Sequence, residues 1–138
     1  MIFLFLACIN SSTDFKEITL RGTVSSTSES TGNVELVALR EWSGKGILRY
    51  PMAELDRTTL SEVGAFEWTL LVEQNEDEGL ALYGWLDSDL DGELCGLNGE
   101  PELSGLTVID YNEVNYNFDL ELNLEHSCVG VERLYGQE

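Results

Sequence analysis

The strongest constraint on the fold is a run of strict alternation near the C-terminus. From Tyr116 to Leu124 every second residue is apolar, and every residue between them is polar or acidic. A period of two places the two kinds of side chain on opposite faces of a β-strand, whereas a helix needs a period near 3.6. The run therefore predicts a strand with one buried face and one solvent-exposed face.

Four other segments carry related patterns. Residues 66–72 repeat the alternation, and residues 18–24 repeat it with β-branched side chains between. Residues 34–40 and 80–86 are apolar on both sides, which is typical of strands in the centre of a sheet. Shorter candidate strands lie at residues 46–50, 106–110 and 129–135.

These strands define the expected fold class. The chain has 138 residues, enough for one domain, and the strands recur at intervals of roughly 8–12 residues with turn-rich segments between them. Only residues 51–62, with Pro51 in the first turn, could form a helix. We therefore expect an all-β domain, a seven- to eight-stranded antiparallel β-sandwich.

The stretch that follows the strand at residues 80–86 points to a metal ion. Asp87, Asp89 and Asp91 stand at alternate positions and Gly92 follows them. Carboxylate oxygens can converge on a hard cation, and glycine permits the sharp turn that this needs, so calcium is the natural candidate. The alternative is a solvated acidic turn that holds no ion.

The charge balance narrows the range of partners. There are 7 Lys and Arg against 26 Asp and Glu, which gives a formal net charge of -19. A phosphate backbone would be repelled by this charge, so nucleic acid is not expected as a partner. The acidic excess has two interpretations that the composition leaves open, namely solubility and a dedicated ion-binding role.

The first eight residues resemble a bacterial lipoprotein signal. An unbroken apolar run ends at Ala7 and Cys8, and polar residues follow at once. The resemblance implies cleavage before Cys8 and a lipid on its sulfur and new amino terminus. It divides the chain into a signal segment (1–7), a tether (8–16) and a β-sandwich domain (17–138) at the cell envelope. Ile9 lacks the acidic character that marks inner-membrane retention, which favours the outer membrane where two membranes exist.

The number of cysteines is consistent with an exported protein. The chain has three of them, and if Cys8 carries a lipid, Cys95 and Cys128 remain as one pair. A disulfide between them is expected in an oxidising compartment. The alternative is two free buried thiols in a reducing compartment.

Most of the remaining chain resembles the transthyretin-like or carboxypeptidase-regulatory-like sandwiches of exported proteins, within the broader Ig-like architecture. The segments that carry the resemblance are residues 22–24 (Gly-Thr-Val), 32–36 (Gly-Asn-Val-Glu-Leu), 64–68 (Gly-Ala-Phe-Glu-Trp), 82–87 (Leu-Tyr-Gly-Trp-Leu-Asp), 91–92 (Asp-Gly) and 99–101 (Gly-Glu-Pro). Such domains are adhesive, structural or accessory, and the resemblance implies a metal-stabilised loop at one end.

The acidic loop is also similar to the calcium loops of dockerins and EF-hands. On that pattern Asp87, Asp89 and Asp91 match the first, third and fifth ligand positions, and Gly92 matches the turn glycine. The pattern also implies that Glu93 offers its backbone carbonyl. Asn98 stands at the twelfth position, where a bidentate Glu is usual, and Glu100 and Glu102 are the nearest acids. Either Glu100 closes a loop that is two residues longer, or the site is incomplete.

No catalytic constellation stands out. His126 is the one histidine available as a general base, and it follows a regular strand. The preferred hypothesis is therefore a lipid-anchored, calcium-stabilised structural or interaction module rather than an enzyme, with a protein or glycan partner that the sequence does not name. The alternative is a carbohydrate-binding module that stacks sugars on surface aromatic residues, for which the candidates are Trp42, Tyr50, Tyr83 and Trp85.

Overall fold

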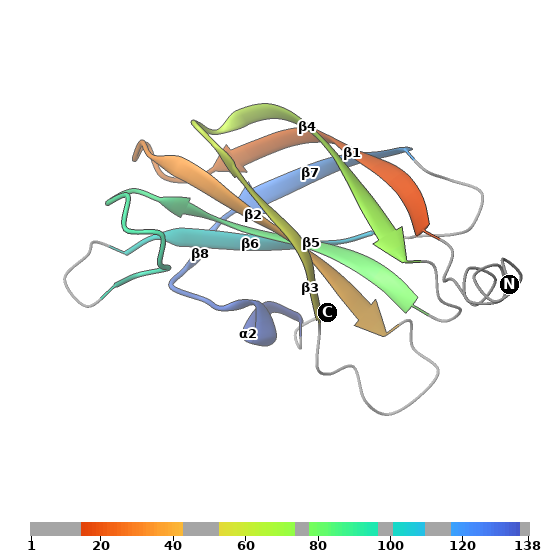
Figure 1. Ribbon diagram of the computed structural model, residues 1–138. Coiled ribbons are helices and arrows are strands. Elements are labelled where there is room, and N and C mark those ends of the chain that lie inside the picture. The colour runs from red at the N-terminus through yellow and green to blue at the C-terminus, as the bar shows by residue number, and fades with distance from the viewer. Residues whose placement is uncertain (1–14, 43–52, 74–77, 97–100, 110–116, 136–138) are drawn as a thin grey trace, which may run out of the picture.

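The computed structural model describes residues 15–42, 53–73, 78–96, 101–109 and 117–135. These residues form strands and one short helix (Figure 1): β1 (Phe15–Ser26), β2 (Asn33–Trp42), β3 (Ala53–Leu60), β4 (Gly64–Glu73), β5 (Glu78–Asp87), β6 (Leu103–Ile109), β7 (Asn117–Leu124), β8 (His126–Ser127) and α2 (Val131–Tyr135). The predicted all-β class is confirmed.

The strands form two sheets that lie face to face, as Figure 1 shows. One sheet has three strands in the order β4-β1-β7, and the other has five in the order β3-β2-β5-β6-β8. The chain is thus a β-sandwich. Every described pair of strands is antiparallel except β1 with β7, which run parallel, so the predicted antiparallel β-sandwich is confirmed with one parallel pair.

The main core lies between the two sheets and accounts for the alternation in β7. Phe118, Leu122 and Leu124 are buried there, while Asp119 and Glu121 on the opposite face are exposed. The three buried residues pack with apolar side chains from β1, β2, β4, β5 and β6 in a single cluster. Burying apolar area of this kind is the main favourable term in folding, at roughly 25 cal/mol per Å².

A second, smaller apolar cluster covers the outer face of the five-stranded sheet. It contains Val37 and Leu39 of β2 together with Tyr83 and Trp85 of β5, and Leu134 of α2 packs on them. Figure 1 shows α2 beside this sheet, on the side away from the three-stranded sheet. Strands β2 and β5 are therefore buried on both faces, which is why their sequences are apolar on both sides.

Two secondary-structure predictions are wrong. Residues 51–62 were the one segment judged able to form a helix, but residues 53–60 form strand β3, which pairs with β2 from Val34↔Leu60 onward. Residues 129–135 were expected to form a strand, but they end in helix α2, where the carbonyl of Gly130 accepts the N–H groups of Arg133 and Leu134. The helix lets Val131 and Leu134 pack on the second cluster together.

The described residues cover some of the other predicted segments and leave out the rest. Residues 106–109 of the expected strand 106–110 belong to β6, whereas residues 46–50 lie outside the described residues. Residues 1–14, which hold the expected signal, Cys8 and most of the tether, also lie outside them. Among the described residues no helix has the length and apolarity that a bilayer-spanning segment needs.

Candidate metal site

The site begins at the base of the connection between β5 and β6. These strands are antiparallel with Trp85 opposite Ser104, and two more residues in each direction bring Asp87 opposite Glu102. Both acids are only 2% exposed. The sandwich therefore holds two buried carboxylates side by side where the connection leaves β5 and returns to β6.

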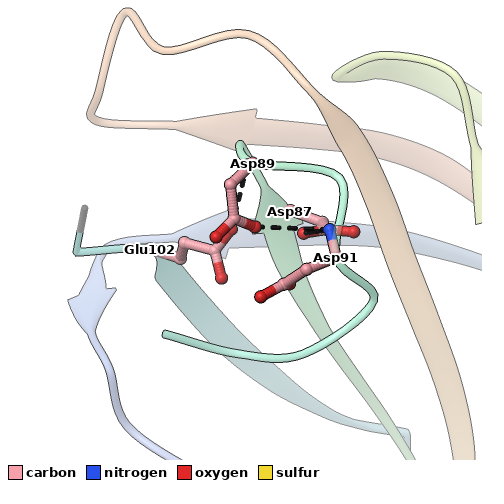
Figure 2. Close-up of side chains that lie close together, drawn as sticks. All are labelled: Asp87, Asp89, Asp91 and Glu102. Atoms are coloured by element: carbon pink, nitrogen blue, oxygen red, sulfur yellow. Dashed lines mark hydrogen bonds between the residues drawn. The ribbon is translucent and has the colours of Figure 1, made fainter. Parts of the chain in front are cut away.

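Two further carboxylates complete a compact group. One oxygen each from Asp87, Asp89, Asp91 and Glu102 can be chosen so that all four lie within 4.8 Å of one another. Figure 2 shows these side chains gathered around a shared space on the inner side of the loop. Asp89 and Asp91 are exposed, so the group has a buried floor and a solvent-facing side. This geometry can hold a metal ion.

The loop curls because its aspartates accept hydrogen bonds from its own backbone. Asp87 Oδ1 accepts the N–H of Asp91 at 3.2 Å, and Asp87 Oδ2 accepts the N–H of Gly92 at 2.9 Å. Asp91 Oδ1 accepts the N–H of Glu93 at 2.9 Å. Asp side chains favour such local bonds, and Gly92 takes a φ of 78°, which only glycine adopts without cost.

Glu102 is fixed by backbone donors from both halves of the loop. Its Oε2 accepts the N–H groups of Ser88 at 2.7 Å and Asp89 at 3.5 Å, and its Oε1 accepts that of Cys95 at 2.7 Å. Burial nevertheless raises the pKa of the Glu102 carboxyl, and the charge of Asp89 adds to the increase, while these N–H donors lower it. A nearby cation would therefore stabilise the charged form of Glu102.

The ion pairs of Arg21 with Glu67 and of Arg57 with Glu54, on the described strands β1, β4 and β3, involve acids outside this group. Four acids that share a small space repel one another when all are ionised. A divalent cation would remove that repulsion and would use the remaining carboxylate lone pairs.

The structure brings together only part of the predicted ligand set. Asp87, Asp89 and Asp91 meet, and the N–H of Glu93 donates to Asp91, while the role predicted for the backbone carbonyl of Glu93 stays a prediction. Asn98 and Glu100 lie outside the described residues, so their roles stay predictions.

Glu102 is the residue that sequence reasoning underrated. Positions counted along a calcium-loop pattern make Glu102 only a neighbouring acid of the loop. The relevant signal is the strand register, since Glu102 immediately precedes β6 and Asp87 ends β5. Pairing the two strands as a hairpin would have placed these acids opposite each other.

A disulfide joins the loop to the C-terminal segment, as predicted. Cys95 and Cys128 are bonded across a sequence separation of 33 residues. In the chain-entropy account a closed loop of this size stabilises the fold by about 3–4 kcal/mol. The bond fastens the acidic loop to the segment that leads into α2.

A small hollow opens beside the acidic group. It has a volume of about 310 Å³ and is lined by Ser30, Thr31, Ser88 and Asp89. Gly32 closes the β1–β2 connection against the loop, and a Cβ at this position would overlap the carbonyl oxygen of Asp87. The β1–β2 connection therefore supports the backbone of the site directly.

The aromatic residues do not form the predicted sugar platform on the described surface. Tyr83 and Trp85 are each 6% exposed and belong to the second apolar cluster. Tyr83 donates its hydroxyl proton to the carbonyl of Val129 at 3.0 Å, and Arg57 lies 5.6 Å from the Trp85 ring. The prediction that these two could face solvent is wrong; Tyr50 and the Trp42 side chain lie outside the described residues.

No protein-family model matches this chain, and no curated protein matches it. Its fold and its site define a β-sandwich domain with a disulfide-linked acidic loop that can hold a metal ion.

Proposed function

We propose that this chain is a non-catalytic, calcium-stabilised β-sandwich that serves as a structural or interaction module at the cell envelope. The observation that carries the proposal is the pair of buried carboxylates, Asp87 and Glu102, grouped with Asp89 and Asp91. A fold that buries two like charges together needs a cation or retained protons to keep them there. An ion would supply the missing charge at neutral pH.

The donor set favours calcium over other common ions. The group offers carboxylate oxygens alone, and an irregular, partly solvated loop suits the flexible coordination of calcium with six to eight oxygens. Magnesium demands near-ideal octahedral geometry and keeps more of its water. Zinc favours nitrogen and sulfur ligands, and both described cysteines are held in the disulfide.

The ion would act on the β5–β6 connection. With calcium bound, the repulsion between the four acids becomes attraction to one centre, and the loop closes over the end of the sandwich. A ligand that binds only the folded state stabilises it by about 2.7 kcal/mol at a concentration one hundred times its Kd. The loop would then present a fixed surface to a partner.

The test is thermal melting of the full chain after treatment with a chelator, with and without millimolar calcium. We expect calcium to raise the midpoint by about 8–10 °C. This is the shift that a stabilisation of about 2.7 kcal/mol produces in a domain of this size. Asp87→Asn and Asp91→Asn should abolish the increase, whereas Asp119→Asn, an exposed acid on β7, should retain it. An unchanged midpoint for the unsubstituted protein would argue for a solvated turn.

We also propose that a lipid on Cys8 tethers the domain to a membrane. The support is the apolar segment that ends at Cys8, together with a Cys95–Cys128 disulfide of the kind that exported proteins use. Cys8→Ser should move the protein from the membrane fraction to the soluble fraction of its cell of origin. Unaltered fractionation of that variant would contradict the tether and leave the calcium site unaffected.

A further inference from the structure

We propose that the Cys95–Cys128 disulfide controls the order of the acidic loop and thereby its cation affinity. Reduction of the bond by a dithiol would loosen Glu102 and weaken metal binding. The metal-binding half of this inference rests on the proposed function, whereas the loop-ordering half does not.

The first observation is that Glu102 is held by both half-cystines. The N–H of Cys95 donates to Glu102 Oε1 at 2.7 Å, and the N–H of Glu102 donates to Cys95 Sγ at 3.0 Å. The N–H of Cys128 donates to the carbonyl of Glu102 at 2.8 Å. The carboxylate, the amide and the carbonyl of this one residue are therefore all bonded to the two cysteines that the disulfide joins.

The second observation is the backbone conformation of the two cysteines. Cys95 has a φ of 50° and Cys128 has a φ of 55°, both in the left-handed region that disfavours residues with a Cβ. The bond between them ties these two backbone positions together, so cutting it removes one constraint on both. When it is cut, each can relax to an ordinary conformation, and the Cys95 N–H then turns away from Glu102.

The third observation is that different contacts hold the two halves of the site. Leu94, beside Cys95, and Val129, beside Cys128, both pack on the second apolar cluster. Asp87 receives its donors from Asp91 and Gly92 instead, and these do not depend on the disulfide. Reduction should thus loosen the Glu102 half of the site while the Asp87 turn persists.

Because the order of the loop and cation binding are thermodynamically linked, reduction of the disulfide changes the affinity of the site for the cation. In the oxidised protein the contacts above hold residues 88–96, so a cation meets four carboxylates in place. In the reduced protein the cation must first order the loop, and that entropy cost lowers its affinity. The coupling is reciprocal, so calcium must make the disulfide harder to reduce by the same factor.

The redox step involves an external dithiol. One of its thiolates attacks a sulfur of the disulfide, which forms a mixed disulfide with one cysteine and releases the other cysteine as a thiolate. Its second thiolate then attacks the reductant sulfur of the mixed disulfide, closes the reductant's own disulfide and releases the remaining cysteine. The reductant loses two electrons and becomes a disulfide. Cys95 and Cys128 take up these electrons with two protons and become thiols. Cys128 is exposed, which gives the reductant a route to the bond.

The main experiment compares calcium binding to the oxidised full chain and to the double variant Cys95→Ser, Cys128→Ser by titration calorimetry. We expect a Kd at least about tenfold higher for the variant, within the usual range of such couplings. Equal affinities would overturn the coupling and leave the proposed calcium site intact. No binding to the oxidised chain would overturn both.

A metal-free measurement tests the loop ordering directly. After reduction in the presence of a chelator, amide hydrogen exchange should accelerate at Ser88 and Cys95, whose N–H groups donate to Glu102. It should change little at Gly92, which donates to Asp87 and serves as the internal control. Unchanged exchange at Ser88 and Cys95 would overturn the proposal.

The protein without substitutions supplies a further check if the double variant does not fold. Equilibrium reduction with dithiothreitol should require more reductant in calcium than in chelator, by the same factor of about ten or more. Asp87→Asn, which keeps both cysteines, should show no calcium effect. A calcium-independent reduction midpoint in the unsubstituted protein would contradict the coupling.

Discussion

Asp87 and Glu102 lie at the two ends of the β5–β6 connection, each is 2% exposed, and a carboxylate oxygen of one lies within 4.8 Å of one of the other. One closes a strand and the other immediately precedes the next, so the sheet itself fixes the spacing between these two residues. Asp89 and Asp91 then add the solvent-facing half of the group. The rigid part of the candidate site is thus built on the sandwich, and the adaptable part on the loop.

The first prediction concerns Glu102, because it distinguishes the observed group from the pattern counted along the sequence. Glu102→Gln should weaken calcium binding at least about tenfold, since it removes one negative charge from the buried floor of the site. Glu121→Gln is the matched control, because Glu121 is exposed on β7. Titration calorimetry measures both. Equal affinities for the two variants would remove Glu102 from the ligand set.

The second prediction uses two glycines with similar φ angles. Gly32 has a φ of 155° and a Cβ there would overlap Asp87, whereas Gly64 has a φ of 140° and open space around it. Gly64→Ala should lower the free energy of unfolding by about 1–3 kcal/mol through backbone strain alone. Gly32→Ala should cost about 1–3 kcal/mol more and also weaken calcium binding, because it displaces the Asp87 backbone.

Urea unfolding and a calcium titration of the two alanine variants measure these effects. If Gly32→Ala left calcium binding as strong as Gly64→Ala does, the β1–β2 connection would not support the site.

The third prediction tests the second apolar cluster. Leu134 is 5% exposed on α2, whereas Leu71 is 65% exposed on β4, so the same substitution samples opposite environments. Leu134→Ala should lower the free energy of unfolding by about 2 kcal/mol, at the low end for a buried leucine because the short helix can settle inward. Leu71→Ala should change it by less than about 0.5 kcal/mol. Similar urea midpoints for both variants would show that α2 adds no stability.

The fourth prediction is a pH dependence. Burial raises the pKa of the Tyr83 hydroxyl, so the folded state favours the neutral phenol. The stability that this contributes is complete below the unfolded pKa of about 10 and is lost as the pH rises above it. At pH 7 Tyr83→Phe should lower the free energy of unfolding by about 0.5–1 kcal/mol, because the hydrogen bond from the Tyr83 hydroxyl to the Val129 carbonyl is lost.

That cost should shrink or reverse near pH 11, because phenylalanine has no proton to lose. Urea unfolding at the two pH values measures the change. A cost that stays constant across this range would mean that Tyr83 ionises as easily in the folded chain as in the unfolded one.

The strands could be predicted from the sequence because their signal is local. In β7 the polarity of each side chain indicates whether it lies on the buried or the exposed face of the strand. In β2 and β5 the apolar residues on both sides indicate burial on both faces. The same local logic failed at residues 51–62, where pairing of β3 with β2 overrides a helical start at Pro51. It also failed at α2, whose five residues carry too little pattern to distinguish a helix from a strand.

The candidate site divides in the same way. Asp87, Asp89 and Asp91 lie within five positions of one another, so their spacing alone indicates convergence. Glu102 joins them through the register of two strands, and the Cys95 and Cys128 backbones reach it through a disulfide. Such long-range relationships depend on the assembled sheet, and no single stretch of residues encodes them.

The most direct test of the central claim is equilibrium dialysis of the chelator-treated, oxidised chain against radioactive calcium. The account predicts one calcium ion bound per chain, and none in the double variant Asp87→Asn, Glu102→Gln. Dialysis that leaves no calcium on the unsubstituted protein at millimolar free ion, or that leaves the same amount on both proteins, would contradict it.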